Sequence, residues 1–365
     1  MEIVQIISNF STGGAERFVI DLSNELYRTG NNVTIVRFFD DKSLNLLEEE
    51  VSSGIKIVTI NKKMGFDFFL LFKVFKYLRK HKAEIVHTHL NSFFYSSLAF
   101  LFLRKPKYFY TIHSMPLKDI QNKFEFFIKK LFFKYKLVVP ISISNEVHKD
   151  SLIHFGKNVR LIFNGRVKPT KTKNYPQVEE TIKNFTENYK YPVILNIGNF
   201  KEAKNQELLI ETVNELNDKE MIVKLLIMGG VKNGERYESL KNQTNPEATL
   251  FVGMVNNPTD YMFLSDIFCL SSLWEGMPIS LIEAYSTKCL AVCTPAGGIV
   301  SMIEDGVNGL ISVDFEKENL KIKLMEAIEI SEIKKSEILN NAYLDYEKLY
   351  SITKSSQEHM KLYLA

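Results

Sequence analysis

The chain has 365 residues, of which 45% are hydrophobic and 24% are charged, and its formal net charge is +3. This composition excludes an intrinsically disordered chain, which would contain fewer apolar residues and a larger net charge. The length exceeds that of one typical hydrophobic core and predicts two domains of about 150–200 residues each.

Neither the cysteines nor the apolar segments indicate a secreted or membrane-spanning protein. Cys269, Cys289 and Cys293 are odd in number and form no C-x-x-C pair, which favours free thiols in a reducing cytoplasm over a metal site. The longest apolar run, residues 93–103, is shorter than the roughly 20 residues that a membrane helix needs. Residues 1–8 lack the basic leader of a signal peptide. We therefore expect a cytoplasmic protein.

The first predicted strand, residues 3–8, leads into the sequence GGAER at residues 13–17 and then into a helix. Two glycines let the backbone approach a ligand closely, and the start of the following helix favours an anion. Gly13 and Gly14 are therefore candidate binding residues. By itself, such a glycine pair fits any nucleotide-binding α/β domain.

Histidines follow two further predicted strands of the first half. The sequence His87-Thr-His89 comes after residues 84–86, and His113 comes after residues 108–110. A single histidine is more often structural than functional. However, the carboxyl ends of parallel strands are where α/β sheets bind ligands, so His113 is a candidate functional residue.

Basic residues are concentrated in the first half of the chain. Residues 1–170 contain 26 Lys and Arg against 15 Asp and Glu, a net charge of +11, and the remaining residues carry −8. Residues 64–82 and 122–136 combine lysines with many phenylalanines. Such segments predict contact with an anionic membrane surface. In the second segment we expect Lys129, Lys130 and Lys134 to face that surface.

Two alternatives to membrane contact exist for these segments. A basic aromatic face can bind nucleic acid, or the aromatic side chains can pack on the sheet of their own domain while the lysines are merely solvated. The charge excess across both segments favours a peripheral position at the inner face of a membrane, and we expect no nucleic-acid partner.

The second half opens with a linker and an early helix over residues 178–189. The sequence NIGNFKEAKN, residues 196–205, then follows a predicted strand and contains Gly198 and Lys204. Further short buried strands are predicted at residues 251–255, 267–270 and 290–293. Each ends in a loop of small residues that opens a helix, as in open α/β sheets that bind ligands at this edge.

The most informative segment is residues 271–298, in which Glu275 and Glu283 lie eight positions apart around a Gly-Met-Pro turn. Pro278 fits the first helical position, because it lacks the N–H that the first turn leaves unpaired. Glu275 then lies in the loop and Glu283 inside the helix, roughly 7–8 Å along the axis. Between them the helix start offers an anion site. This arrangement suits a sugar–diphosphate–ribose ligand, and the alternative is an ordinary amphipathic helix with two solvated glutamates.

Together these motifs resemble the retaining glycosyltransferases of family four (glycosyl transferases group 1). Glu275 and Glu283 fall on the Glu-x7-Glu signature of that family, and GGAER matches its glycine loop. The resemblance implies the α/β GT-B fold, in which two Rossmann-like domains face each other across a cleft. It places an acceptor domain at residues 1–168, a nucleotide-sugar donor domain at residues 169–342, and a C-terminal helix at residues 343–365 that packs back on the first domain.

The resemblance also implies an activity, which is transfer of a hexose or N-acetylhexosamine from a nucleotide sugar, with UDP as the expected nucleotide. The implied acceptor is a hydroxyl of a glycan or lipid-linked molecule in bacterial surface polysaccharide synthesis. We expect no cofactor and no metal, because the sequence contains no Asp-x-Asp motif of the expected kind. A nucleotide-sugar epimerase of the same fold and a non-catalytic sugar-binding relative are the alternatives.

The resemblance assigns roles to individual residues. Glu283 is expected to bind the ribose and Glu275 the donor sugar, while His113 is expected to donate a hydrogen bond to the sugar or a phosphate. The expected catalytic residues are His113, Glu275 and Lys204. The expected donor-binding residues are Gly13, Gly14, Gly198, Asn199, Lys204, Gly276, Met277, Pro278 and Glu283.

The chain departs from the family pattern at three positions. Asn199 stands where an arginine is usual, Ser301 where a glutamate is common, and Lys288 where a glycine is usual. An amide lacks the charged fork that arginine offers a diphosphate, so Lys204 is expected to be the matched cation. Asn199 and Ser301 favour the non-catalytic alternative, whereas the intact pair of glutamates favours an enzyme.

Overall fold

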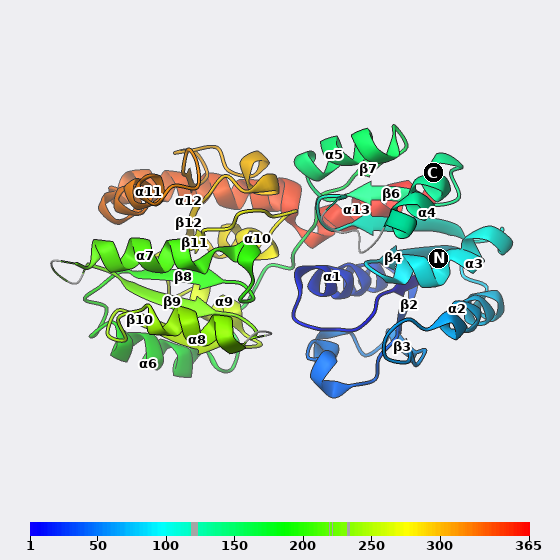
Figure 1. The fold of residues 1–365 in the computed structure, drawn as a ribbon, viewed down its shortest axis with the longest axis horizontal. Helices are drawn as coiled ribbons and strands as arrows, with labels where there is room; N and C mark the ends of the chain where they lie inside the picture. The colour runs from blue at the N-terminus through cyan, green and yellow to red at the C-terminus, as the bar shows by residue number, and fades with distance from the viewer. Residues whose placement is uncertain (118–122, 219, 221, 232–233) are drawn as a thin grey trace. The chain divides into compact units, whose positions relative to one another are not determined.

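The computed structural model of the chain describes residues 1–117, 123–218, 220, 222–231 and 234–365. The chain forms two compact units, one of Met1–Val167 with Leu349–Ala365 and one of Lys168–Lys348. Each unit is built on one parallel sheet with helices packed on it (Figure 1). The first unit ends one residue before the boundary at 168 that the sequence predicts.

The described residues of the first unit form a seven-stranded parallel sheet in the order β3-β2-β1-β4-β5-β6-β7. All five residues of β4 are buried, which requires that helices cover both faces of the sheet. The strands are β1 (Glu2–Ile6), β2 (Asn32–Arg37), β3 (Lys56–Thr59), β4 (Ile85–His89), β5 (Lys107–Ile112), β6 (Val139–Ser142) and β7 (Arg160–Leu161).

The helices of the first unit include the last one of the chain. They are α1 (Gly14–Arg28), α2 (Phe68–His81), α3 (Ser92–Phe102), α4 (Lys123–Lys134), α5 (Asn145–Phe155) and α13 (Ile352–Leu364). Helix α13, red in Figure 1, packs against α1. Thr353 donates to Glu25 of α1 at 2.9 Å, and Ser355 donates to the carbonyl of Phe163 at 2.8 Å. The last helix therefore belongs to the first unit.

The second unit contains a six-stranded parallel sheet, counted over its described residues, in the order β10-β9-β8-β11-β12-β13. The strands are β8 (Val193–Ile197), β9 (Lys224–Met228), β10 (Thr249–Gly253), β11 (Ile267–Leu270), β12 (Leu290–Cys293) and β13 (Leu310–Ile311). The helices are α6 (Tyr175–Phe185), α7 (Gln206–Leu216), α8 (Gly234–Asn242), α9 (Pro258–Met262), α10 (Ile279–Thr287), α11 (Lys317–Glu329) and α12 (Glu332–Asp345).

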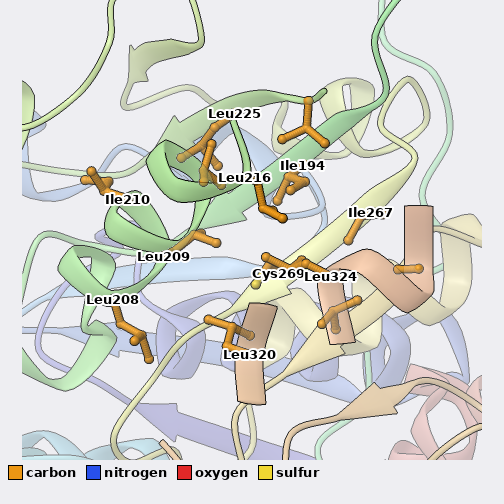
Figure 2. Packing of buried hydrophobic residues seen from close by; sticks show 14 of the residues in the cluster. Ile194, Leu208, Leu209, Ile210, Leu216, Leu225, Ile267, Cys269, Leu320 and Leu324 are labelled. Atoms are coloured by element: carbon orange, nitrogen blue, oxygen red, sulfur yellow. The ribbon is translucent and has the colours of Figure 1, made fainter. Parts of the chain in front are cut away.

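The core of the second unit lies between its sheet and the helix pair α7 and α11 (Figure 2). Ile194 of β8 and Ile267 of β11 project from the central strands toward Leu209 of α7 and Leu324 of α11. Each of these side chains is at most 1% exposed. Complete burial of one such side chain stabilises a fold by about 1.5–3 kcal/mol, so this cluster holds β8 and β11 firmly side by side.

Some strands and helices begin or end at other residues than predicted, because the backbone is left-handed there or because a residue caps the helix. Strand β10 ends at Gly253, with φ +79°, two residues before the predicted end. Helix α6 ends at Phe185, because Asn188 and Tyr189 have φ values of +63° and +62°. Pro278 is the extended N-cap of α10 and not its first helical residue.

The C-terminal helix begins later than predicted. Residue 343 lies inside α12, which belongs to the second unit and packs against α10. A π-helical turn, Tyr346–Tyr350, follows, and the unit changes after Lys348. The physical reason is a second helix start at Ser351, whose hydroxyl accepts from the N–H of Lys354 and caps α13.

Both basic aromatic segments bury some apolar residues and expose several phenylalanines. In α2 the apolar residues Leu70, Leu71, Val74 and Leu78 are buried, while Phe68, Phe69 and Phe72 are 50–67% exposed. In α4, Phe133 is buried and Phe124 and Phe127 are exposed. Residue 122, the start of the second predicted segment, lies outside the described residues.

Lys129 does not face the surface, which corrects the expectation for α4. Its side chain is only 4% exposed, and its ammonium lies 2.9 Å from both the Glu125 carboxylate and the Tyr110 hydroxyl. Positions 125 and 129 share one helix face, and here that face points into the domain. Lys130 and Lys134, by contrast, are exposed.

We predict that Lys129→Glu destabilises the first unit by about 3–5 kcal/mol, because it buries two like charges without a partner. Lys130→Glu, on the exposed side of the same helix, should change stability by less than about 0.5 kcal/mol. Urea unfolding followed by the fluorescence or circular dichroism of the full chain measures both values. Equal stability of the two variants would contradict the buried position of Lys129.

Candidate active site

In both sheets the strand order reverses once, between β1 and β4 in the first unit and between β8 and β11 in the second. In the second unit, β8 is followed in space by β9 on one side and β11 on the other. Open α/β sheets bind ligands at the carboxyl ends of strands at such a reversal. The loop after β8 contains Gly198, Asn199 and Lys204, and the loop after β11 contains Glu275. The topology therefore brings together the residues that the sequence singles out in this unit.

An ion pair joins the two loops. The Lys204 ammonium lies 2.5 Å from Oε1 of Glu275, and the Ser272 hydroxyl donates to the same oxygen at 2.6 Å. The side chains of Lys204 and Glu275 are 21% and 11% exposed. Partial burial strengthens such a pair, and removal of one partner leaves the other charge in a poorly solvated position. Lys204, expected to be the cation for a diphosphate, is thus bound to Glu275 in this structure.

The backbone around Lys204 is held by bonds from the neighbouring loop. The N–H of Leu273 donates to the carbonyl of Ala203 at 2.8 Å, and the Ser271 hydroxyl donates to the carbonyls of Lys204 and Asn205. Asn205 has a φ of +44°, a left-handed conformation that asparagine tolerates better than most residues. These contacts give Lys204 a defined position.

Gly198 and Asn199, which follow β8, form hydrogen bonds with residues at the C-terminal end of β9. The N–H of Gly198 donates to the carbonyl of Met228, and Oδ1 of Asn199 accepts from the N–H of Gly230 at 3.0 Å. The carbonyl end of the Asn199 side chain is therefore used within the protein. An arginine at this position, as is usual in the resembled family, would lose this acceptor because its side chain has only donors.

The helix that follows β11 carries the second glutamate. Met277 and Pro278 are buried, Gly276 is partly exposed, and α10 begins directly after them. Glu283 lies in the second turn of α10 and is 3% exposed. A solvated surface glutamate, the alternative reading of this position, is therefore excluded.

The backbone of Gly297 and Gly298 packs closely on the carbonyl of Glu275. The N–H of Gly298 donates to the Glu275 carbonyl at 3.1 Å. Gly297 has a φ of +51°, and a Cβ atom there would lie 2.2 Å from the same carbonyl oxygen. Only glycine fits at position 297, both for its conformation and for space.

In the first unit, Gly13 and Gly14 form the start of α1 after β1. Gly13 is the N-cap, and its carbonyl accepts from the N–H of Arg17. A Cβ atom on Gly13 would lie 2.3 Å from Oε2 of Glu16, and the Ser11 hydroxyl donates to Oε1 of Glu16 at 3.0 Å. A carboxylate of the protein itself therefore lies over the glycine loop.

His113 follows β5, and its Nε2 lies 3.1 Å from Nδ1 of His89 at the end of β4. Burial lowers the pKa of His113 to about 3, with nearby His359 adding to the effect. The ring is therefore neutral near pH 7 and supplies no positive charge to a phosphate.

Comparison with known protein families decides the class of the chain. The model of glycosyl transferases group 1 matches residues 177–344, and the model of glycosyltransferase family 4 matches residues 12–166. The chain belongs to the glycosyl transferases group 1. It is a glycosyltransferase with two Rossmann-like domains of the GT-B fold, as the sequence motifs imply.

Individual relatives of this glycosyltransferase agree with that class. The capsular polysaccharide biosynthesis glycosyltransferase CapH of Staphylococcus aureus is 25% identical and covers 100% of this chain and 99% of its own. An alpha-1,4-N-acetyl-D-galactosaminyltransferase of Campylobacter jejuni, named for a diNAcBac-PP-undecaprenol acceptor, is 26% identical over 99% of this chain and 98% of its own.

The fold of this glycosyltransferase also matches solved structures. Anabaena HepE in complex with UDP and glucose superposes with a TM-score of 0.83 at 19% identity, over 99% of each chain. At that identity the match shows the shared fold.

Sequence motifs missed the residues that support the glutamates and the histidine of this glycosyltransferase. Ser272 donates to Glu275, and Gly297 packs on its carbonyl, but neither position has a spacing that pairs it with Glu275. The partner of His113 is His89 of β4, and the partner of His89 is Gln5 of β1, both far away from His113 in the sequence. The small residues that end β11 were the available signal for Ser272.

We predict that Gly297→Ala lowers the stability of the second unit more than Gly306→Ala does. Both glycines have a positive φ, of +51° and +71°, but no atom lies within 4 Å of a Cβ atom at Gly306. Both variants should pay the conformational penalty of about 1 kcal/mol or more. Gly297→Ala should additionally displace the Glu275 backbone, which thermal unfolding and loss of donor binding would together reveal. Equal melting temperatures would contradict the close contact.

Proposed function

We propose that this glycosyltransferase moves a hexose or N-acetylhexosamine from a UDP-sugar to a hydroxyl of a glycan or lipid-linked acceptor, with retention at the anomeric carbon, in the synthesis of bacterial surface polysaccharide. The observation that carries the proposal is the pair of glutamates, one in the loop after β11 and one buried in α10, on either side of a helix start. Carboxylates bind sugar hydroxyls, and a helix start binds phosphate.

The chemistry requires that a departing diphosphate be stabilised. The start of α10 offers backbone N–H groups and a positive dipole end, and Lys204 offers a full charge beside it. In our proposal a donor sugar engages Glu275 through its hydroxyls and Lys204 shifts toward the diphosphate. When the donor binds, the ion pair between Lys204 and Glu275 is thus replaced by two contacts with the ligand, one from each side chain.

In the first unit, we propose that Gly13, Gly14 and His113 contact the bound donor, as the family resemblance implies. The helix start at Gly14 again offers unpaired N–H groups. Glu16 has to leave the glycine loop before an anion binds there, because its carboxylate lies over Gly13.

The names of two relatives support the acceptor class. CapH is named for capsular polysaccharide biosynthesis and the Campylobacter jejuni enzyme for a polyprenyl-diphosphate-linked glycan. Both are similar to this chain over nearly its entire length. A nucleotide-sugar epimerase would act without an acceptor, so consumption of the donor should depend on added acceptor if the chain is a transferase.

We propose further that the reaction needs neither a metal nor an organic cofactor. Lys204 and the start of α10 supply the positive charge that a divalent cation supplies in other transferases. Unchanged turnover after treatment with EDTA would support this, and restoration of lost turnover by Mg²⁺ or Mn²⁺ would overturn it.

We predict that UDP stabilises the protein thermally more than GDP or ADP does, and that Glu283→Ala weakens UDP binding about tenfold to a hundredfold. Loss of a hydrogen bond to a charged group costs about 1.5–3 kcal/mol. Glu275→Ala should leave binding of UDP itself intact and weaken binding or turnover of the UDP-sugar. Calorimetric titration with UDP and with the UDP-sugar separates the two effects.

Comparison of the two glutamate variants tests which glutamate binds the nucleotide and which binds the sugar. Loss of UDP affinity in Glu275→Ala as large as in Glu283→Ala would show that the two roles are wrongly assigned. At a nucleotide concentration of about 100 times a micromolar dissociation constant, binding should stabilise the protein by about 2.7 kcal/mol. If none of the three nucleotides stabilises the wild-type protein at that concentration, the proposed donor class is wrong.

We also propose that the first unit docks on an anionic membrane through the α2 patch, defined as Met64, Phe66, Phe68, Phe69 and Phe72. These side chains are 50–91% exposed. Lys63, Asp67, Phe69, Phe72, Lys73 and Lys76 line a shallow hollow there. Exposed aromatics with lysines around them suit the interface of an anionic bilayer. Among the described residues, no helix is long and apolar enough to cross a membrane.

We predict that the protein sediments with vesicles containing anionic lipid and that this binding falls at high salt. Replacement of Phe69 and Phe72 by serine should remove most of the binding, whereas the same change at Phe124 and Phe127 of α4 is the matched control. Reversal of Lys63, Lys73 and Lys76 to glutamate should weaken binding more than tenfold, since each contributes about 1 kcal/mol. Equal sedimentation with neutral and anionic vesicles would refute the proposal.

A further inference from the structure

The first unit contains a buried cluster of histidines of which the proposed function uses one. His87 and His89 come from β4, His113 follows β5, and His359 lies in α13. The ring centroids of His87 and His89 are 4.3 Å apart, and those of His89 and His113 are 5.3 Å apart. Burial lowers the pKa of each of these histidines. The rings are therefore neutral, and each has one N–H donor and one acceptor nitrogen.

One chain of hydrogen bonds in this cluster leads from β1 to His113. Oε1 of Gln5, a fully buried residue of β1, lies 2.9 Å from Nε2 of His89. Nδ1 of His89 lies 3.1 Å from Nε2 of His113. A carbonyl oxygen only accepts, so the proton of His89 is on Nε2 and its Nδ1 is an acceptor. Nε2 of His113 must then donate, which leaves the lone pair of His113 on Nδ1.

The orientation of the Gln5 amide sets the direction of this chain, because exchange of its oxygen and nitrogen would reverse both bonds. The Tyr363 phenol is also close enough to Gln5 for its pKa to be affected. Burial raises the pKa of Tyr363, and the Gln5 side chain lowers it in part, as a nearby amide donor does. In the structure the carbonyl oxygen of Gln5 is directed to His89, and the amide nitrogen has no hydrogen-bond partner among the described residues.

We propose that Gln5 and His89 are positioning residues that hold His113 as the Nε2–H tautomer, so that its Nδ1 accepts a hydrogen bond from a hydroxyl group of the sugar ligand. This inference rests on the proposed function, in which His113 contacts the donor. His113 is partly exposed, and within the described part of the chain no hydrogen bond involves its Nδ1. A phosphate oxygen has no proton to donate to such a nitrogen. This proposal differs from the expectation that His113 donates a hydrogen bond to the ligand.

A second branch of the cluster provides a matched control. His87 contacts the Tyr363 hydroxyl through Nδ1 at 2.7 Å and the Thr111 hydroxyl through Nε2 at 2.8 Å. Neither of these bonds involves Gln5, His89 or His113. Thr111→Val removes one buried hydrogen bond of the cluster without breaking the chain to His113, whereas Gln5→Met removes the acceptor at the head of that chain at similar side-chain length.

The test combines ring ¹⁵N NMR of the full chain, labelled at histidine, with transfer kinetics. In the wild-type protein and in Thr111→Val, His113 should show the Nε2–H tautomer. In Gln5→Met, it should show a mixture of tautomers, and kcat should fall between about twofold and tenfold, the effect of one neutral hydrogen bond. Stabilisation by UDP alone should be equal in all three proteins.

Each adverse result has a separate meaning. An Nδ1–H tautomer of His113 in the wild-type protein overturns the inferred direction of the chain. A kcat of Gln5→Met equal to that of Thr111→Val overturns the positioning role. Absence of transfer in the wild-type protein contradicts the proposed function instead, and the NMR measurement still decides the tautomer.

Discussion

The structure depends on the constraint that a parallel sheet must be covered on both faces. Strands such as β4 and β8 are buried along nearly their entire length, so helices have to cover both sides and the strand ends become the places where loops carry polar groups. Where the strand order reverses, two neighbouring loops diverge and leave room for a ligand. The placement of Lys204 and Glu275 follows from this arrangement, since β8 and β11 are adjacent although more than 60 residues of the chain separate the two side chains.

Electrostatics then distinguishes the two units. In the second unit, a lysine and a glutamate neutralise each other in a partly exposed position, where both can exchange partners. In the first unit, burial keeps four histidines neutral, and their hydrogen bonds, not their charges, determine what His113 can offer. The second unit thus presents a charged pair at its strand ends, and the first unit presents a neutral ring.

The surface of the first unit shows why composition alone does not define an interaction face. Residues 64–82 and 122–136 look alike in sequence, because both mix lysine with phenylalanine. In the structure both helices expose phenylalanines, but Lys129 of α4 is buried against Glu125 and Tyr110, while Lys73 and Lys76 of α2 are exposed. Helical periodicity indicates which residues share a face, but only packing decides which face points inward.

The sequence by itself determined the family, the α/β architecture and the polar residues of the loops after β8 and β11, because those features depend on local patterns. Glycines after strands, short apolar runs and the spacing of Glu275 and Glu283 are readable within windows of about ten residues. The tertiary structure alone decided that Lys204 pairs with Glu275, that Gly297 packs on the Glu275 carbonyl, and that Gln5 reaches His113 through His89. These contacts join residues distant along the chain, and their partners are chosen by strand order and burial, which no local pattern encodes.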